Sequence, residues 1–145
     1  MQISAGWIIA GAFLILCAAI DIKSREIPVW IIILFGISAA AYIGISGQIQ
    51  LVSIAYSLIP GASLLALSLC TKESIGYGDG WIVLILGIFT GVETCLLIVI
   101  AALIFSALSA AVLLMLKKVN GKSRIPFLPF LTMGLGVVFY AQSCF

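Results

Sequence analysis

The chain has 145 residues, of which 64% are hydrophobic and 8% are charged, and its mean hydropathy is +1.36. Soluble globular domains carry about 25% charged residues, so this composition excludes a water-soluble globule and predicts an integral protein of the lipid bilayer. The formal net charge of +2 is too small to indicate nucleic-acid binding. We therefore expect no nucleic-acid partner.

Apolar runs fill almost the whole chain. A membrane-spanning helix needs about 17–25 mostly apolar residues, and we assign six runs as spans. They are Ile3 to Ile20, Pro28 to Ser46, Leu51 to Cys70, Asp79 to Gly91, Thr94 to Leu116 and Ile125 to Cys144. The sequence thus predicts one domain, residues 1–145, folded as an all-α, polytopic bundle of about six transmembrane helices. Pro60 and Gly61 predict a kink in the third span.

The basic residues occupy alternate loops. The first, third and fifth loops contain every Lys and Arg, whereas the second and fourth loops and both termini contain none. The first loop contains Lys23 and Arg25, the third contains Lys72, and the fifth contains Lys117, Lys118, Lys122 and Arg124. The positive-inside rule assigns the basic face to the cytoplasm. We expect a multi-pass protein of a bacterial or archaeal cytoplasmic membrane, with both termini outside.

The chain has two aspartates, and both lie where an apolar run meets the basic face. Asp21 ends the first run, and Asp79 stands in the glycine-rich segment Gly76-Tyr77-Gly78-Asp79-Gly80 at the start of the fourth. Acidic residues at membrane depth are functional candidates by default. Since the two share one depth, packing of the first and fourth helices would bring their carboxylates together.

The residue types that the chain lacks narrow the chemistry. It has no histidine, which excludes the usual Ser-His-Asp and Cys-His sites and the HExxH metalloprotease site. The four cysteines are scattered singly and form no CxxC pair, so no thiolate zinc site is expected. A pair of carboxylates remains, in which one acts as a base toward water and the other as an acid toward a carbonyl. We expect neither a metal nor an organic cofactor.

The surroundings of both aspartates also allow simpler interpretations. Gly76, Gly78 and Gly80 remove side-chain bulk and permit positive φ, which would let a substrate backbone approach Asp79. Alternatively, Asp79 is an ordinary N-cap of the fourth helix. Asp21 is alternatively an interfacial residue beside the basic residues of the first loop.

Three sequence blocks, in order along the chain, resemble the type IV prepilin peptidases, which are membrane aspartyl proteases of the GxGD class. The blocks are Asp21 to Pro28, with its basic stretch and Ile-Pro, then Gly76-Tyr77-Gly78-Asp79, and then Pro126-Phe127-Leu128-Pro129. The resemblance implies an aspartic endopeptidase, a hydrolase in which Asp21 and Asp79 are catalytic. The residues expected to shape the site or bind substrate are Gly76, Gly78, Gly80, Lys23, Pro28, Pro126, Phe127 and Pro129.

The resemblance also implies the substrate. It is a type IV prepilin or pseudopilin precursor of a pilus or secretion system, whose leader peptide is cut at the cytoplasmic face. The cytoplasmic insertion with CxxC pairs, which longer relatives use for N-methylation, is not found here, so a peptidase-only form is expected. The sequence departs from the family pattern at Val29, Trp81 and Leu128, which affects the details of substrate contact and leaves both carboxylates in place.

Three alternatives remain open at this stage. The chain is alternatively a non-enzymatic transport or assembly subunit whose interfacial carboxylates bind a proton or a cation. The GxxxG pattern from Gly87 to Gly91 either packs inside the bundle or supports an oligomer. Cys95 and Cys144, both expected outside, either pair or stay free.

Overall fold

The computed structural model describes residues 5–24, 27–46, 51–70, 77–116 and 126–144. All regular elements in these ranges are α-helices, which confirms the all-α prediction. They are α1 (Ala5–Ser24), α2 (Val29–Ser46), α3 (Leu51–Ser57), α4 (Ile59–Cys70), α5 (Tyr77–Thr90), α6 (Val92–Met115) and α7 (Leu128–Cys144).

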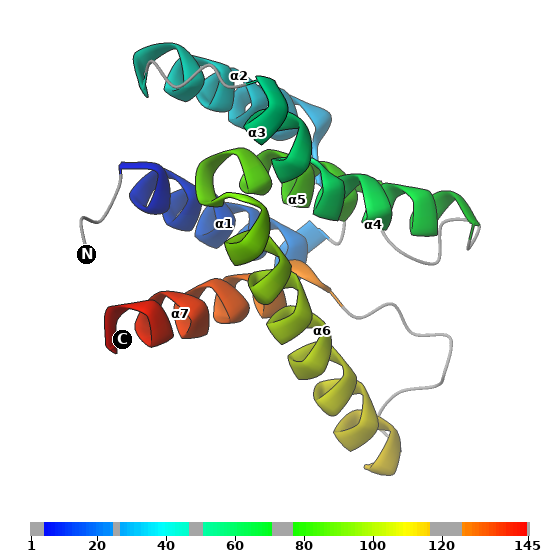
Figure 1. The fold of residues 1–145 in the computed structure, drawn as a ribbon. Helices are drawn as coiled ribbons and strands as arrows, with labels where there is room; N and C mark the ends of the chain where they lie inside the picture. The colour runs from blue at the N-terminus through cyan, green and yellow to red at the C-terminus, as the bar shows by residue number, and fades with distance from the viewer. Residues whose placement is uncertain (1–4, 25–26, 47–50, 71–76, 117–125, 145) are drawn as a thin grey trace.

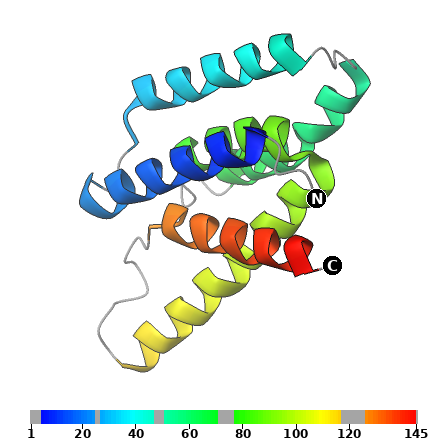
Figure 2. The same cartoon turned by 90° about the vertical axis from the view of Figure 1, so that its left-hand side faces the viewer.

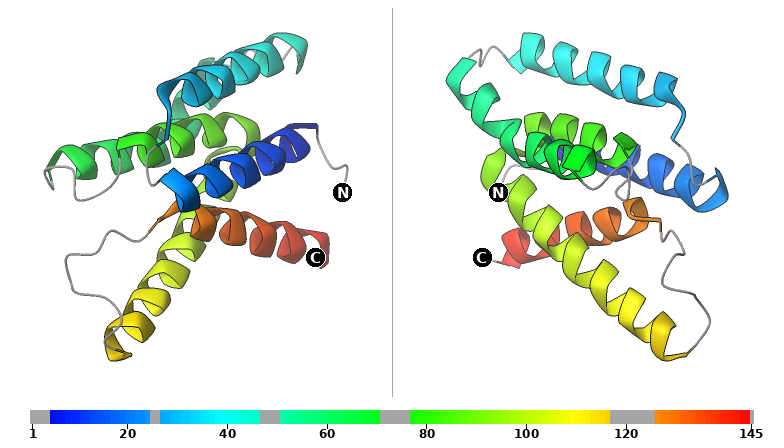
Figure 3. Two further views of the ribbon diagram at one scale, coloured as in Figure 1. Left: turned by 180° about the vertical axis from the view of Figure 1, so that it is seen from behind. Right: turned by 90° about the vertical axis from the view of Figure 1, so that its right-hand side faces the viewer.

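Successive helices alternate in direction. In Figure 1, α1, α4 and α6 run one way while α2, α5 and α7 run the other, and the start of α1 lies at the same end as the finish of α7. The views in Figures 2 and 3 show the same alternation. Within the described ranges, two stretches are both long and apolar enough to cross a bilayer, Gly6–Ser24 and Val92–Met115, and four shorter apolar helices accompany them. The number of spans and the sidedness of the termini stay predictions.

The third predicted span is divided at Leu58 into α3 and α4, which confirms a kink next to Pro60. Proline lacks the N–H that would bond to the carbonyl four residues earlier, and its ring clashes with that carbonyl. Gly61 allows close packing of α4 on α5, because a Cβ at this position would overlap the backbone of Leu84 in α5. The break therefore lets α4 lie directly against α5.

Helix α5 is the centre of the fold and contacts α1, α2, α4 and α6. Its buried positions cover most of the helix surface and leave one stripe that is not buried, formed by Trp81, Leu84 and Ile88. The buried positions are Asp79, Gly80, Ile82, Val83, Ile85, Leu86, Gly87 and Phe89. At its end, Gly91 adopts a φ of 80° and the chain continues at once into α6.

Aromatic rings tie α1 and α2 to this central helix. Phe13 stacks on Phe35 with ring centroids 4.1 Å apart, and Phe35 stacks on Phe89 at 5.3 Å. Gly87 lies against the carbonyl of Ser57 in α3, so this glycine of the GxxxG pattern packs inside the bundle. Self-association stays a prediction.

Helix α6 crosses the other helices obliquely and extends away from them, as both panels of Figure 3 show. It meets α7 at Gly134, where a Cβ would lie 2.7 Å from the carbonyl oxygen of Ile98. After Ala102, no residue of α6 is buried among the described part of the chain. The close crossing holds α7 against the bundle, with its first turn beside the end of α1.

Candidate active site

Asp21 lies in the last turn of α1. The helix continues past the predicted boundary at Ile20 as far as Ser24, and Asp21 is only 7% exposed. It extends the buried face formed by Leu14, Cys17 and Ala18, whose spacing follows the helical period. The carboxylate is therefore held inside the fold and not at a solvated helix end, contrary to the interpretation of Asp21 as an ordinary interfacial residue.

Asp79 lies in the first turn of α5 and is 9% exposed. Because the helix already begins at Tyr77, Asp79 is inside the first turn and is not the N-cap residue. The capping interpretation of this carboxylate is therefore wrong. Ile82 and Val83, which follow within one turn, are fully buried, so the aspartate starts the buried surface of the central helix.

The two aspartates interact. Helices α1 and α5 pack against each other, and the charge on Asp21 acts on the Asp79 carboxyl. Two buried acids from distant parts of the sequence are thus brought into electrostatic range, as the argument from shared membrane depth predicts. Among the described residues, no three His, Cys, Asp or Glu side chains gather at a position where they could hold a metal ion.

A third element reaches this pair from α7. The backbone N–H of Leu128 donates a hydrogen bond to Oδ2 of Asp21 at an N···O distance of 3.4 Å, and the bond is buried. The carbonyl of Phe127 accepts bonds from the N–H groups of Phe130 and Leu131, which starts the helix. The Pro-Phe-Leu-Pro segment therefore lies at the site because its first helical turn contacts Asp21.

The glycines on either side of Asp79, Gly78 and Gly80, are points of close packing, and their predicted role in admitting a substrate backbone stays a prediction. Both Gly78 and Gly80 are helical, so the expectation of positive φ at these positions is wrong. A Cβ on Gly78 would lie 2.9 Å from Cδ1 of Ile27, and one on Gly80 would lie 2.7 Å from Cδ2 of Leu65. The absence of side chains lets neighbouring segments pack closely against α5, and Ile27 thereby brings the first sequence block onto the second.

The other predicted site residues are arranged around this centre. Lys23 is exposed in the last turn of α1, and the carbonyl of Pro28 accepts the N–H of Ile31 at the start of α2. The half-buried residues Pro126, Phe127 and Pro129 lie at the start of α7. Gly76 falls outside the described residues. Roles for these residues in binding substrate stay predictions.

Leu128 is the site residue that sequence reasoning missed. By sequence it is a departure from the family pattern, whereas in the structure its backbone N–H contacts Asp21 and its side chain is fully buried. A backbone donor has no residue type by which a motif can reveal it. The available signal was Pro129, because proline is favoured in the first turn of a helix and a helix start presents free N–H groups.

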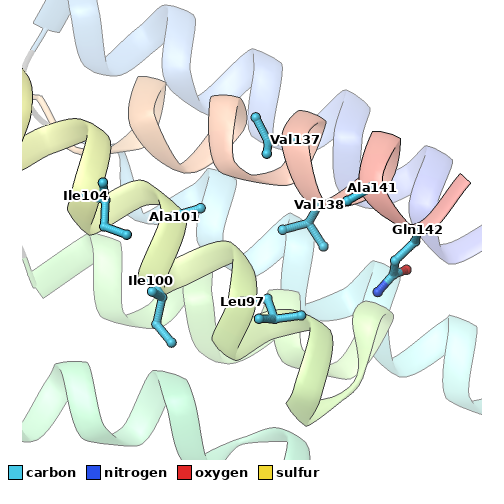
Figure 4. A pocket seen from close by; sticks show the side chains of 8 residues that line it. All are labelled: Leu97, Ile100, Ala101, Ile104, Val137, Val138, Ala141 and Gln142. Carbon is cyan, nitrogen blue, oxygen red and sulfur yellow. The ribbon is translucent and has the colours of Figure 1, made fainter. Parts of the chain in front are cut away.

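An apolar groove of about 440 Å³ lies elsewhere, between α6 and the second half of α7. Figure 4 shows that Leu97 and Ile104 from one helix, and Val138 and Gln142 from the other, line it. Neither aspartate contributes to this groove. The side-chain amide of Gln142 bonds to Oγ1 of Thr94 at 3.4 Å, which joins the two helices at this point.

Comparison with known proteins gives one match. The sequence model of the type IV leader peptidase family matches residues 8–115, which include both aspartates and exclude α7. No curated protein and no solved structure matches the chain. All four cysteines are free in the structure, so Cys95, which is buried, and Cys144, which is exposed, are not joined to each other.

Proposed function

The chain belongs to the type IV leader peptidase family, and from this premise we propose that it is a membrane aspartyl endopeptidase. In this proposal it removes the leader peptide from a type IV prepilin-like precursor. The observation that carries the proposal is the burial of Asp21 and Asp79 on two packed helices, within electrostatic range of each other.

Such a pair performs peptide hydrolysis without a covalent intermediate. Two close carboxylates share one proton because both cannot readily ionise. The ionised carboxylate takes a proton from a water molecule as that water attacks the scissile carbonyl carbon, while the protonated carboxyl donates to the carbonyl oxygen. As the C–N bond breaks, one carboxyl gives its proton to the leaving amine, and the other carboxylate accepts a proton from a hydroxyl of the tetrahedral intermediate. The new chain end is then a carboxylic acid, and the pair again holds one proton. The dyad acts as a unit, so neither role belongs to one residue in every step.

We place the site at the cytoplasmic face of the membrane. The support is the segregation of Lys and Arg into alternate loops, together with Lys23, which lies two positions after Asp21 in the same helix turn. The alternating helix directions in Figure 1 agree with this arrangement. A precursor with an apolar helix would then lie in the bilayer beside the bundle, with its leader extending to Asp21 and Asp79.

The test is co-expression of the full chain with a tagged type IV prepilin precursor, followed by mass spectrometry of the product. The wild-type protein should shorten the precursor at one bond, whereas Asp21→Asn and Asp79→Asn should each leave it uncut. Glu93→Gln is the matched control, because Glu93 is an exposed acid at the start of α6 and should retain cleavage. Near wild-type processing by either Asn variant would overturn the two-aspartate mechanism, whereas no processing by the wild-type protein would favour a non-enzymatic subunit that binds a proton or cation.

A further inference from the structure

We propose that the backbone N–H of Leu128, at the start of α7, positions Asp21 for catalysis. The inference rests on the proposed peptidase function and adds a group from outside the matched family region, which ends at residue 115. Leu128 is a positioning residue in this proposal, since its N–H contacts the carboxylate and not the substrate.

The first turn of α7 presents a single backbone donor to its surroundings. Pro129 has no N–H, and the N–H groups of Phe130 and Leu131 both bond to the carbonyl of Phe127. Leu128 is therefore the one residue among the first four of this helix, all of them described, whose N–H is directed to another element. That element is Asp21, through Oδ2.

The hydrogen bond between Leu128 and Asp21 lies in a buried part of the structure, which makes its loss costly. Leu128 is fully buried, Asp21 is 7% exposed, and α1 and α7 pack along their lengths. Because the amide of Leu128 is buried, loss of this bond would leave its N–H without a partner, at a cost in free energy. The bond to Oδ2 restricts rotation of the carboxylate and leaves Oδ1 for Asp79 and the attacking water. Its N···O length of 3.4 Å exceeds the usual range of about 2.7–3.2 Å, as is common for catalytic hydrogen bonds without bound substrate.

The same contact explains how the third sequence block belongs to the site. Pro129 has no N–H, and the Phe127 carbonyl accepts the N–H groups of Phe130 and Leu131. The first turn of α7 therefore has one N–H left, which bonds to one carboxylate oxygen of Asp21. Substrate need not contact Pro126 or Pro129 for these residues to affect the reaction. Their contribution is to fix where α7 begins.

The experiment compares two substitutions at one position. Leu128→Pro removes the N–H and fits the fixed φ of a helix start, whereas Leu128→Ala keeps the N–H and removes the same buried side chain. Each full-length variant is purified into liposomes and assayed with a tagged type IV prepilin precursor. We expect kcat of Leu128→Pro to fall about tenfold or more below that of Leu128→Ala with KM unchanged, because small misplacements of a catalytic group cost this much.

A second variant covers the case in which Leu128→Pro does not fold. Replacement of residue 128 by the corresponding α-hydroxy acid turns the amide N–H into an ester oxygen and keeps the leucine side chain. Its kcat should fall by a similar factor, again at unchanged KM. Equal kcat for the ester and wild-type proteins would overturn the positioning role. That result would leave the proposed function intact as long as Asp21→Asn and Asp79→Asn remain inactive, so the two failures are distinguishable.

Discussion

The N–H of Leu128 and Oδ2 of Asp21 lie 3.4 Å apart, although 107 positions separate them in the chain. This bond joins the start of α7 to the end of α1. The charge on Asp21 in turn reaches Asp79 at the start of α5. Three helix ends thus converge on one pair of carboxylates, and each of the three sequence blocks contributes one of those ends.

The first prediction concerns how the aspartates act together. Each single Asn variant should lose cleavage while keeping its place in the membrane, and the double variant Asp21→Asn/Asp79→Asn should be no slower than either. Residues that act as a unit fail as a unit, because one carboxylate without its partner cannot run both proton transfers. The measurement is single-turnover cleavage of the precursor by equal amounts of membrane-inserted protein. A double variant much slower than both single variants would indicate independent roles.

Much of the fold follows from composition and the spacing of apolar runs. Each predicted span corresponds to a helix or, at Pro60, to a pair of helices, because a run of this hydropathy can satisfy its backbone in a bilayer only as helix. The helix ends are less predictable. For example, α1 continues through Asp21 to Ser24, because the aspartate extends a buried face that hydropathy alone does not reveal.

The site was predictable as far as it depends on side-chain chemistry. The types and common depth of Asp21 and Asp79 indicated a pair, and the structure brings them into electrostatic range. The close packing at Gly78 and Gly80 was not predictable, because the neighbours that these glycines face, Ile27 and Leu65, are brought there by the tertiary fold. The N–H of Leu128 was hidden for a related reason, because every residue except proline has such a group.

The second prediction tests the close packing of α4 on α5. Gly61→Ala should destabilise the fold by about 1–3 kcal/mol, the usual cost of overpacking, because its Cβ would overlap the backbone of Leu84 and backbone cannot rotate away. Thermal unfolding in detergent measures the effect, as a lower Tm.

The matched control for this change is Gly136→Ala in α7. A Cβ at Gly136 meets nothing within 4 Å, so alanine should be neutral or stabilise the helix by roughly 0.5–1 kcal/mol. Equal Tm values for the two variants would mean that Gly61 is not packed against α5 as described.

The third prediction separates a carboxylate mechanism from a thiol mechanism. Cys17 lies one turn before Asp21 on the same buried face of α1, so it is the thiol best placed to be mistaken for a catalytic group. Cys17→Ala should keep kcat within about threefold of wild type, with some loss of stability from the removed buried atom. The measurement is steady-state cleavage of the precursor together with Tm. Complete loss of cleavage by a folded Cys17→Ala protein would point to thiol chemistry instead.

The last prediction concerns topology and follows from the distribution of Lys and Arg. Reporters fused after Arg25, Lys72 and Lys122 should report the cytoplasm, whereas fusions near Gly47 and at the C-terminus should report the outside. The physical reason is that basic loops are retained on the cytoplasmic side during insertion, while the second and fourth loops carry no Lys or Arg. The helices alternate in direction in Figure 1, with the short α3 set aside. The helix ends next to the basic loops therefore lie opposite the two termini. Paired reporters, one active only in the cytoplasm and one only outside, measure each position twice. A cytoplasmic C-terminus would contradict the six-span arrangement, and a Gly47 fusion reporting cytoplasm would show that α1 and α2 do not both cross the membrane.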